Sequence, residues 1–265
     1  MSQAVLNVAV SAAHAAGEQM RRRFDQVSGI PVTRKARHDY VSEVDHACEA
    51  AIVREISHYY PEHAFLAEEG GASGDSDTVW IIDPLDGTSN YLHGVPHFAV
   101  SIAQQIKGRT EIGVVFDPMR DELFTAVRGR GAFMNQKRIR VSPRIDLETA
   151  VLATAFPFRR RDTMARFGRV FQGVMEKTED FRRMGTASLD LAYVASGRLD
   201  GYYEVGLDAW DVAAGALLVR EAGGVVMDFD GNDNVEEARS IIAAPYKLMT
   251  PLQKIIANRW KRPSA

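Results

Sequence analysis

The stretch from Trp80 to Pro96 reads WIIDPLDGTSNYLHGVP and carries the strongest functional pattern in this chain. An apolar, β-prone run over residues 79–82 ends in two carboxylates, Asp83 and Asp86, which a turn of small residues follows. Two aspartates three positions apart on a kinked loop can converge on one hard cation. The backbone N–H groups of the Gly-Thr-Ser turn, where a helix is expected to begin, can bind an anion. The stretch therefore predicts a place where a metal ion meets a phosphate.

The composition is that of an ordinary soluble globular protein. Of 265 residues, 46% are hydrophobic and 25% are charged, and the formal net charge is -3. This balance gives no global attraction to nucleic acid or to an anionic membrane, so only a local patch could bind a polyanion. Three arginine clusters are candidates, and for the first two a solvated helix face or turn is the simpler interpretation: Arg21–Arg23, Arg159–Arg161 and Arg182–Arg183.

Compartment signals point to the cytoplasm. The single cysteine, Cys48, cannot form an intrachain disulfide, which fits a reducing compartment, and it lies on the apolar face of a predicted helix. The N-terminal segment lacks the basic, apolar and cleavage regions of a signal peptide. The longest strongly apolar stretch, residues 212–219, is far shorter than the roughly 20 residues that span a bilayer. We expect a cytoplasmic protein without a membrane segment.

The first part of the chain predicts two amphipathic helices and one acidic strand end. Apolar residues at helical spacing predict a helix over residues 5–20, a polar and mobile loop over 35–39, and a second helix that ends before Pro61. Ser42 and Asp45 have the spacing of a capping box, so Asp45 has a purely structural explanation as a first-turn carboxylate. A strand over 64–67 ends on Glu68-Glu69, which in isolation are more typical of solvated loop acids, and residues 70–78 predict a surface loop.

The remainder of the chain predicts a mixed, layered α/β architecture without internal repeats. Gly- and Pro-containing turns separate successive strands of an antiparallel meander at residues 98–106, 111–116 and 122–127. Strands and helices then alternate, with strands at 150–155, 201–205, 225–229 and 240–244, a helix at 163–177 and a closing helix that begins at Thr250-Pro251.

Further candidate site residues stand where these predicted elements meet. Glu204 ends a strand, and Gly185–Ser188 forms a second small-residue turn that opens a helix. Asp211 stands at the start of another helix, in the run Trp210–Gly215, and a helix cap is an equally simple explanation for it.

These segments together resemble the inositol monophosphatase family. The matching motifs cover essentially the whole chain in the family's order: Glu68-Glu69-Gly70, residues 80–88, residues 210–215 and Glu221-Ala222-Gly223-Gly224. The superfamily comprises metal-dependent, lithium-sensitive phosphatases and also holds fructose-bisphosphatases and bisphosphate nucleotidases. The resemblance implies a layered αβαβα sandwich of mixed α/β class, in one domain over residues 1–265 with two sub-layers at roughly 1–145 and 146–265.

The resemblance also implies a set of metal ligands. Glu68, Asp83 and the backbone carbonyl of Leu85 would hold one Mg²⁺, and Asp83, Asp86 and Asp211 would hold a second. A weaker third ion would rely on Glu68 and water. Electrostatics supports this, because four carboxylates at close range are costly unless a cation relieves their repulsion.

The catalytic and substrate roles follow from the same resemblance. Thr88, polarised by Asp45, would orient a nucleophilic water together with Glu68, and the N–H groups of Gly87 and Thr88 would hold the phosphate. A helix N-cap role for the Thr88 hydroxyl can coexist with this one. Substrate hydroxyls would meet Asp86, the turn Gly185, Thr186 and Ala187, and Glu204. Lys35 aligns with a loop lysine that closes over the metals, whereas His93 and His97 are interpreted as structural.

The implied activity is Mg²⁺-dependent, Li⁺-inhibited hydrolysis of myo-inositol monophosphate and related polyol phosphates by a homodimer, without a phosphoenzyme. An alternative substrate is another small ester: a bisphosphorylated nucleotide, fructose bisphosphate or histidinol phosphate. Residues 185–193 and 201–204 resemble the monophosphatase branch rather than the nucleotidases. Phe181-Arg182-Arg183 and residues 189–195 resemble a bacterial subgroup that also acts in transcription antitermination with Nus factors and RNA polymerase. That role is the alternative of another class.

Overall fold

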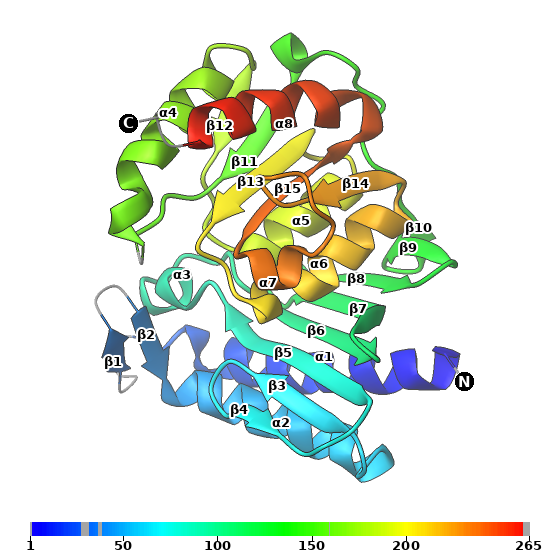
Figure 1. Cartoon of the computed structure of the whole chain (residues 1–265). Helices are drawn as coiled ribbons and strands as arrows, with labels where there is room; N and C mark the ends of the chain where they lie inside the picture. The colour runs from blue at the N-terminus through cyan, green and yellow to red at the C-terminus, as the bar shows by residue number, and fades with distance from the viewer. Residues whose placement is uncertain (1, 28–31, 37–38, 159, 262–265) are drawn as a thin grey trace.

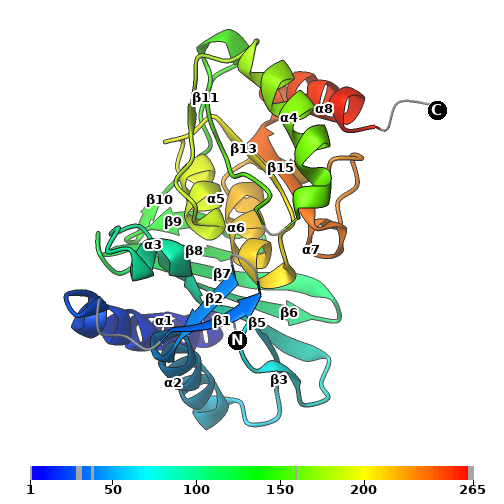
Figure 2. The ribbon, with the colours of Figure 1, turned by 90° about the vertical axis from the view of Figure 1, so that its left-hand side faces the viewer.

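The computed structural model describes residues 2–27, 32–36, 39–158 and 160–261, with the backbone alone for residues 2, 32–36 and 39–41. Within these ranges, helices and sheets alternate in five layers (Figure 1). Figure 2 shows the same stack after a turn of 90°. The predicted layered αβαβα architecture is therefore confirmed.

An eight-stranded sheet forms the lower half of the described structure. The strand order is β10-β9-β8-β7-β6-β5-β3-β4, and every pair is antiparallel except β3 with β5. The predicted meander is therefore confirmed. The strands are β3 (Ala64–Ala67), β4 (Gly71–Ser73), β5 (Thr78–Asp86), β6 (Ala99–Ile106), β7 (Arg109–Asp117), β8 (Glu122–Val127), β9 (Gly131–Met134) and β10 (Lys137–Arg138).

A five-stranded mixed sheet forms the upper half of the described structure, in the order β12-β11-β13-β15-β14. Strand β11 is parallel to both of its neighbours, whereas β15 is antiparallel to β13 and β14. The strands are β11 (Val151–Thr154), β12 (Asp180–Arg182), β13 (Gly201–Val205), β14 (Gly224–Met227) and β15 (Ser240–Pro245).

Three pairs of helices complete the layers. The pair α1 (Ser2–Phe24) and α2 (Glu43–Tyr59) covers the outer face of the eight-stranded sheet, at the bottom of Figure 1. The pair α5 (Ala187–Ala195) and α6 (Ala209–Glu221) lies between the sheets. The pair α4 (Met164–Met175) and α8 (Tyr246–Trp260) closes the top. Shorter elements are α3 (Thr88–Leu92), α7 (Val235–Ala238) and 3-10 turns at Leu147–Thr149 and Arg161–Thr163.

Burial of β5 on both faces explains why its sequence is a continuous apolar run. Successive strand residues point to opposite faces, and Trp80 packs into the layer of α1 and α2 while Ile81 packs into the middle layer with α5 and α6. A sheet that is covered on both faces needs apolar residues at odd and at even positions of the strand, so apolar and polar residues do not alternate.

Strand β5 extends further than the sequence predicted. The acids do not lie on a loop after Ile82, because the strand continues through Asp83 to Asp86. Its register against β6 shifts between these two residues, so one extra residue is accommodated in a bulge. Pro84 lies in the bulge, where the N–H that proline lacks is not needed for the ladder. The bulge thus lies at the end of β5, with one of the two aspartates on each side of it.

Other predicted boundaries also differ. Residues 35 and 36 belong to strand β1 (Val32–Ala36), which pairs with β2 (Asp39–Ser42), rather than to a loop, and residues 37–38 lie outside the described residues. The predicted loop over 70–78 contains β4. Helix α8 begins at Tyr246 and carries Pro251 inside it, because Leu248 and Met249 are buried in the layer of α4 and α8.

Two local predictions are confirmed. The capping box at the start of α2 is present, since the Ser42 N–H donates to Asp45 Oδ2 at 2.8 Å and the Ser42 side chain accepts from the helix backbone. Cys48 is fully buried in the layer of α1 and α2.

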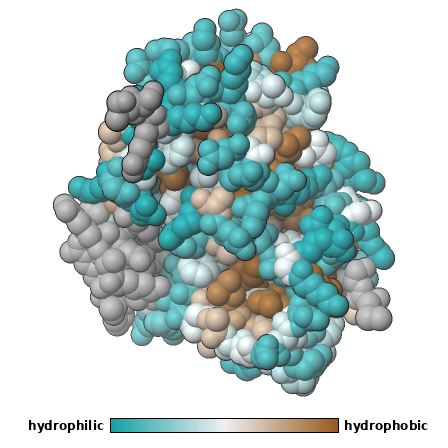
Figure 3. Space-filling model, viewed as in Figure 1, coloured by the Kyte–Doolittle hydropathy of each residue, from teal (hydrophilic) through white to brown (hydrophobic). Residues whose placement is uncertain are grey.

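The face seen in Figure 3 is largely hydrophilic, and hydrophobic side chains on it form only small patches. A search of the helices in the described ranges finds none with the length and apolar content needed to cross a bilayer.

Close packing of α5 against α6 generates a stability prediction. A Cβ on Gly215 would lie 2.6 Å from Leu191 Cβ, so Gly215→Ala would force the two middle helices apart. We expect a loss of about 1–3 kcal/mol in the free energy of unfolding, measured by urea denaturation.

Gly168→Ala is the matched control, because Gly168 on α4 is exposed and nothing lies within 4 Å of the point where a Cβ would stand. This change removes a flexible helical glycine and should add up to about 1 kcal/mol. Equal stability of Gly215→Ala and the wild type would contradict the packing argument.

Candidate active site

A cavity of about 690 Å³ opens where the two sheets and the middle helices meet. The end of β5, the start of α3, the loop after β13 and the start of α6 all contribute to its lining. Most of the predicted site residues line it: Glu68, Asp83, Leu85, Asp86, Gly87, Thr88, Gly185, Ala187, Glu204 and Asp211.

Three carboxylates converge in this cavity. Asp83 and Asp86 come from the bulged end of β5, and Asp211 is the third residue of α6. Each offers an oxygen, and these oxygens all lie within 4.8 Å of one another. Asp211 does not serve as the helix N-cap, because Asp208 occupies that position.

The electrostatic state of Asp83 shows what this convergence costs. Its side chain is only 1% exposed. Burial raises the pKa of Asp83 well above its ordinary value, and the negative charges of Glu68, Asp86 and Asp211 raise that pKa further. A hydrogen bond with Glu68 acts in the same direction. Carboxylate and carbonyl oxygens are the ligands that a hard divalent cation prefers, so these carboxylates and the Leu85 carbonyl fit a Mg²⁺ site.

Each converging aspartate has one oxygen held by a backbone N–H. Leu85 donates to Asp83 Oδ1 at 3.0 Å, and Asp208 donates to Asp211 Oδ2 at 2.7 Å. Ser188 donates to Asp86 Oδ2 from its N–H at 2.7 Å and from its hydroxyl at 2.6 Å. These bonds orient the carboxylates before any ligand arrives.

Thr88 and Asp45 form the pair that the resemblance implied. The Thr88 hydroxyl lies 3.1 Å from Asp45 Oδ1 and 3.0 Å from the Leu85 carbonyl oxygen. It has one proton, so it can donate fully to only one of these acceptors. Asp45 Oδ2 accepts from Ser42, so the capping role and the contact with Thr88 use different oxygens. The expected N-cap role of Thr88 is wrong, because Thr88 is the first residue of α3 and Gly87 is the N-cap of that helix.

The Gly87 backbone requires a glycine. Its φ is +93°, and a Cβ there would lie 2.6 Å from the Thr186 hydroxyl oxygen.

Thr186 is buried and donates to the His97 carbonyl at 3.0 Å, so its side chain joins the 185–188 turn to the first half of the chain and does not line the cavity. Asn90 strengthens the same junction by donating to the Met184 and His97 carbonyls, each at 2.8 Å.

Glu204 reaches the cavity lining from β13, in the upper sheet, whereas the aspartates of the bulge come from the lower one. The Tyr202 hydroxyl donates to Glu204 Oε2. Burial raises the pKa of Tyr202, and the charge of Glu204 raises it further, so this hydroxyl stays protonated and continues to act as a donor.

Asp190 is a site neighbour that the sequence did not reveal. It is fully buried on α5, and neither carboxylate oxygen has a hydrogen-bond partner among the described residues. Burial raises the pKa of Asp190 well above its ordinary value, and the charges of Glu204 and Asp86 add to this effect while Arg183 opposes it. Nothing in the local sequence distinguishes this residue from a solvated helical acid.

The cavity also has a basic and aromatic side that sequence reasoning did not assign. The lining includes Phe156, Phe158, Arg160, Arg161 and Arg183. Arg160 and Arg161 therefore line a cavity instead of forming only a solvated turn, and Arg160 pairs with Asp162 at 3.2 Å. The Arg183 guanidinium lies 5.5 Å from the centre of the Phe158 ring. In the sequence, the arginine clusters at 159–161 and 182–183 were the signal that could have identified this side of the cavity.

His93 and His97, which were interpreted as structural, and Lys35, which was aligned with a loop lysine, have different outcomes. His93 lines the cavity, whereas His97 is buried and its pKa is lowered, chiefly by that burial. The side chain of Lys35 lies outside the described residues, and its backbone belongs to β1.

This chain is similar to several known proteins. A family model for the inositol monophosphatase family matches residues 1–264. A Haemophilus influenzae protein named Nus factor SuhB is 49% identical over 247 residues, with 92% of each chain covered. The crystal structure of extragenic suppressor protein suhB from Bartonella henselae has 45% identity and a TM-score of 0.93, covering 96% of this chain and 98% of that one.

An inositol monophosphatase structure from Anabaena (Nostoc) has 37% identity and a TM-score of 0.85, covering 97% of this chain and 96% of that one. The match of the family model along the chain, the identity of the relatives and the shared fold are consistent with one another. This chain belongs to the inositol monophosphatase family.

Proposed function

We propose that this chain is a Mg²⁺-dependent phosphatase that hydrolyses myo-inositol monophosphate and related polyol phosphate monoesters. The observation that carries the proposal is the convergence of Asp83, Asp86 and Asp211, whose oxygens lie within 4.8 Å of one another, in the cavity that also holds Thr88. Membership of the inositol monophosphatase family supports the same reaction class.

Glu68, Asp83, the Leu85 carbonyl, Asp86 and Asp211 would hold two to three Mg²⁺ ions. Bound Mg²⁺ would neutralise the phosphate oxygens, lower the pKa of a water and stabilise the leaving alkoxide. The protein groups orient the reactants. Thr88, next to Asp45 at 3.1 Å, and Glu68 would hold the attacking water in line with the phosphorus. Water attacks directly, so no phosphoenzyme forms.

The other side of the cavity would bind the alcohol. Glu204, oriented by the Tyr202 hydroxyl, offers a carboxylate acceptor for substrate hydroxyls. Gly185 and Ala187 line the same cavity, and Asp86 accepts two hydrogen bonds from Ser188, the residue that follows this turn. Several acceptors at fixed positions suit a polyol better than a simple alkyl alcohol.

An ester panel tests this proposal. The wild-type chain with Mg²⁺ should release phosphate from inositol monophosphates faster than from a bisphosphorylated nucleotide, fructose bisphosphate or histidinol phosphate, and Li⁺ should inhibit it. Asp83→Asn should lower kcat/KM more than about 100-fold, beyond the range for residues that only support a ligand.

Asp75→Asn is the matched control, because Asp75 is an exposed acid in the loop before β5. It should leave the rate unchanged. Fast turnover of a nucleotide without turnover of inositol phosphates would refute the proposed substrate.

The raised pKa of Asp83 generates a second prediction, for metal-free protein. A protonated Asp83 stabilises the fold, and this contribution is lost as the pH rises from the ordinary carboxyl value of about 4 through the raised folded value. Asn cannot ionise. The Tm of Asp83→Asn should therefore increase relative to that of the wild type as the pH rises.

Calorimetry with and without Mg²⁺ checks this effect. At neutral pH, Mg²⁺ should raise the Tm of the wild type more than that of Asp83→Asn, because the ion relieves the repulsion that the variant already lacks. A difference in Tm that stays constant with pH would contradict the assignment of Asp83.

A second candidate function is association with the transcription machinery. The observation that favours it is the name Nus factor SuhB borne by a relative that is 49% identical over most of its length. We propose that the same fold also binds Nus factors or RNA polymerase, as a role separate from hydrolysis.

Pull-down of purified Nus factors and RNA polymerase checks this role. Asp83→Asn should abolish hydrolysis and leave the pull-down intact, because the Asp83 side chain is almost fully buried and is not available to a protein partner. Loss of both activities in a folded variant would argue against an independent scaffold role.

A further inference from the structure

Arg239 contacts three consecutive residues of the loop that enters α6. Its carbonyl accepts from the Gly206 N–H at 2.7 Å, and its Nη2 lies 2.8 Å from Asp208 Oδ1. A longer and weaker bond of 3.4 Å runs from its Nε to the Leu207 carbonyl. Arg239 ends the α7 turn with a φ of +56°, a conformation that is unfavourable for a side chain with a Cβ unless its surroundings hold it.

The loop that Arg239 contacts joins the two sides of the candidate site. Residues 206–208 follow the strand that carries Glu204 and precede the helix that carries Asp211. The Asp208 N–H donates to Asp211 Oδ2 at 2.7 Å. A continuous path of contacts therefore runs from the Arg239 guanidinium through Asp208 to one of the three converging carboxylates.

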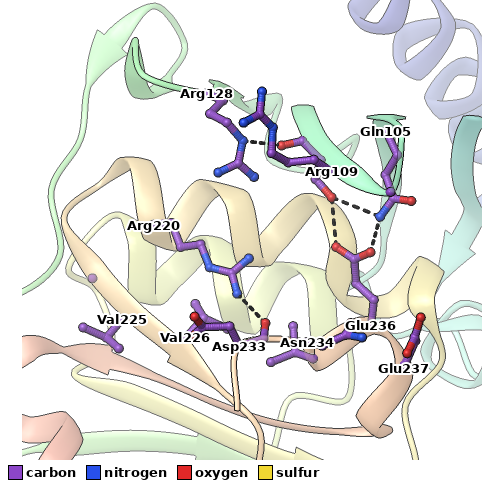
Figure 4. Close-up of a pocket in the computed structure, with 14 residues that line it drawn as sticks. Gln105, Arg109, Arg128, Arg220, Val225, Val226, Asp233, Asn234, Glu236 and Glu237 are labelled. Atoms are coloured by element: carbon purple, nitrogen blue, oxygen red, sulfur yellow. Dashed lines mark hydrogen bonds between the residues drawn. The ribbon is translucent and has the colours of Figure 1, made fainter. Parts of the chain in front are cut away.

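The segment that carries Arg239 is itself fixed to other layers. A second cavity has a volume of about 610 Å³, and Figure 4 shows Glu236 reaching from α7 toward Gln105 in it. Glu236 also accepts from the Thr110 hydroxyl at 2.9 Å. Arg220 on α6 donates to the Asp233 carbonyl at 2.9 Å. Asp233 is thus held by α6, and Glu236 by the hairpin of β6 and β7.

Arg109, Arg128 and Glu236, which line this second cavity, have partners within the protein. Arg109 and Arg128 lie 2.6 Å and 3.7 Å from Glu111, and Glu236 accepts from two neutral donors. The polar groups of this cavity are thus better explained as contacts that fix α7 than as a binding site for a charged ligand.

We propose that Arg239 is a positioning residue, which fixes the 206–208 loop and so holds Asp211 in its metal-binding orientation. The inference rests on the proposed function in one respect, that Asp211 is a metal ligand. Arg239 contacts neither the converging carboxylates nor the cavity lining in the described structure beyond the loop itself, so it acts through Asp208.

A merely structural ion pair would behave differently. The Arg239 and Asp208 side chains are 49% and 32% exposed, and pairs this exposed contribute little to stability. A structural role therefore predicts a small change in Tm and no change in metal affinity, whereas a positioning role predicts weaker metal binding even where Tm hardly moves.

The experiment measures Mn²⁺ binding to the full chain by electron paramagnetic resonance, without substrate. Arg239→Gln and Asp208→Asn should each raise the Mn²⁺ dissociation constant about three- to tenfold, below the roughly 10–100-fold effect of a group bonded directly to a ligand. Asn retains the ability to cap a helix, so Asp208→Asn removes the ion pair and keeps the cap. The Mn²⁺ dissociation constant of the double variant should equal the higher of the two single-variant values, because both changes break the same path from Arg239 through Asp208 to Asp211.

Arg198→Gln is the matched control. Arg198 pairs with Glu122 through two bonds of 2.5 Å and 2.6 Å, with a side chain 36% exposed, and neither residue lines the candidate site. This variant should lower Tm at least as much as Arg239→Gln and leave the Mn²⁺ dissociation constant unchanged.

Unchanged Mn²⁺ affinity in Arg239→Gln and Asp208→Asn would overturn the inference, as would an equal loss of affinity in Arg198→Gln. In either case the wild type would still bind Mn²⁺, so the proposed function would stand. A wild-type chain that binds no Mn²⁺ would instead remove the metal site on which both proposals depend.

Discussion

Repulsion among buried carboxylates is the constraint on which the rest of this structure depends. Asp83 is almost fully buried, and Glu68, Asp86 and Asp211 surround it closely enough to raise its pKa. An apolar core would exclude such a cluster, because each charge loses hydration and gains a like neighbour. The cluster is tolerable where a cation can join it, and the five-layer stack places it at the edge of a cavity that a cation can enter.

The layers supply what the cluster needs from segments far apart in the chain. The bulged end of β5 supplies two acids, and the first turn of α6 brings a third. Ser188 on α5 then holds Asp86 with two bonds across 102 residues of sequence separation. The middle helices pack closely enough that Gly215 has no room for a Cβ beside Leu191. The precision of the site therefore depends on the packing of α5 and α6 between the sheets.

Structural and functional explanations of one residue are compatible at several positions. Asp45 closes the capping box of α2 with one oxygen and meets the Thr88 hydroxyl with the other. Asp208 caps α6 and also donates its N–H to Asp211, while Arg239 holds it from a third segment. A capping role and a role in the site are therefore compatible for Asp45 and Asp208, since a carboxylate has two oxygens and a backbone unit has its own donor.

The sequence by itself determined the order of the elements, the capping box of α2, the family resemblance and the acids near strand ends. It did not determine the N-caps of α3 and α6, which are Gly87 and Asp208 instead of the expected Thr88 and Asp211. The elements and the capping box follow from periodicity and from contacts within a few residues, which explains why the strand over 201–205 and the capping box at Ser42 were predicted correctly. The family resemblance rests instead on the motifs and their order along the chain. Only the tertiary structure decided that β5 continues through its acids, that Thr186 turns away from the cavity, that Asp190 is buried beside Glu204 and that Arg239 holds the loop before Asp211. Each of these depends on register and packing between layers, and local sequence patterns carry no information about either.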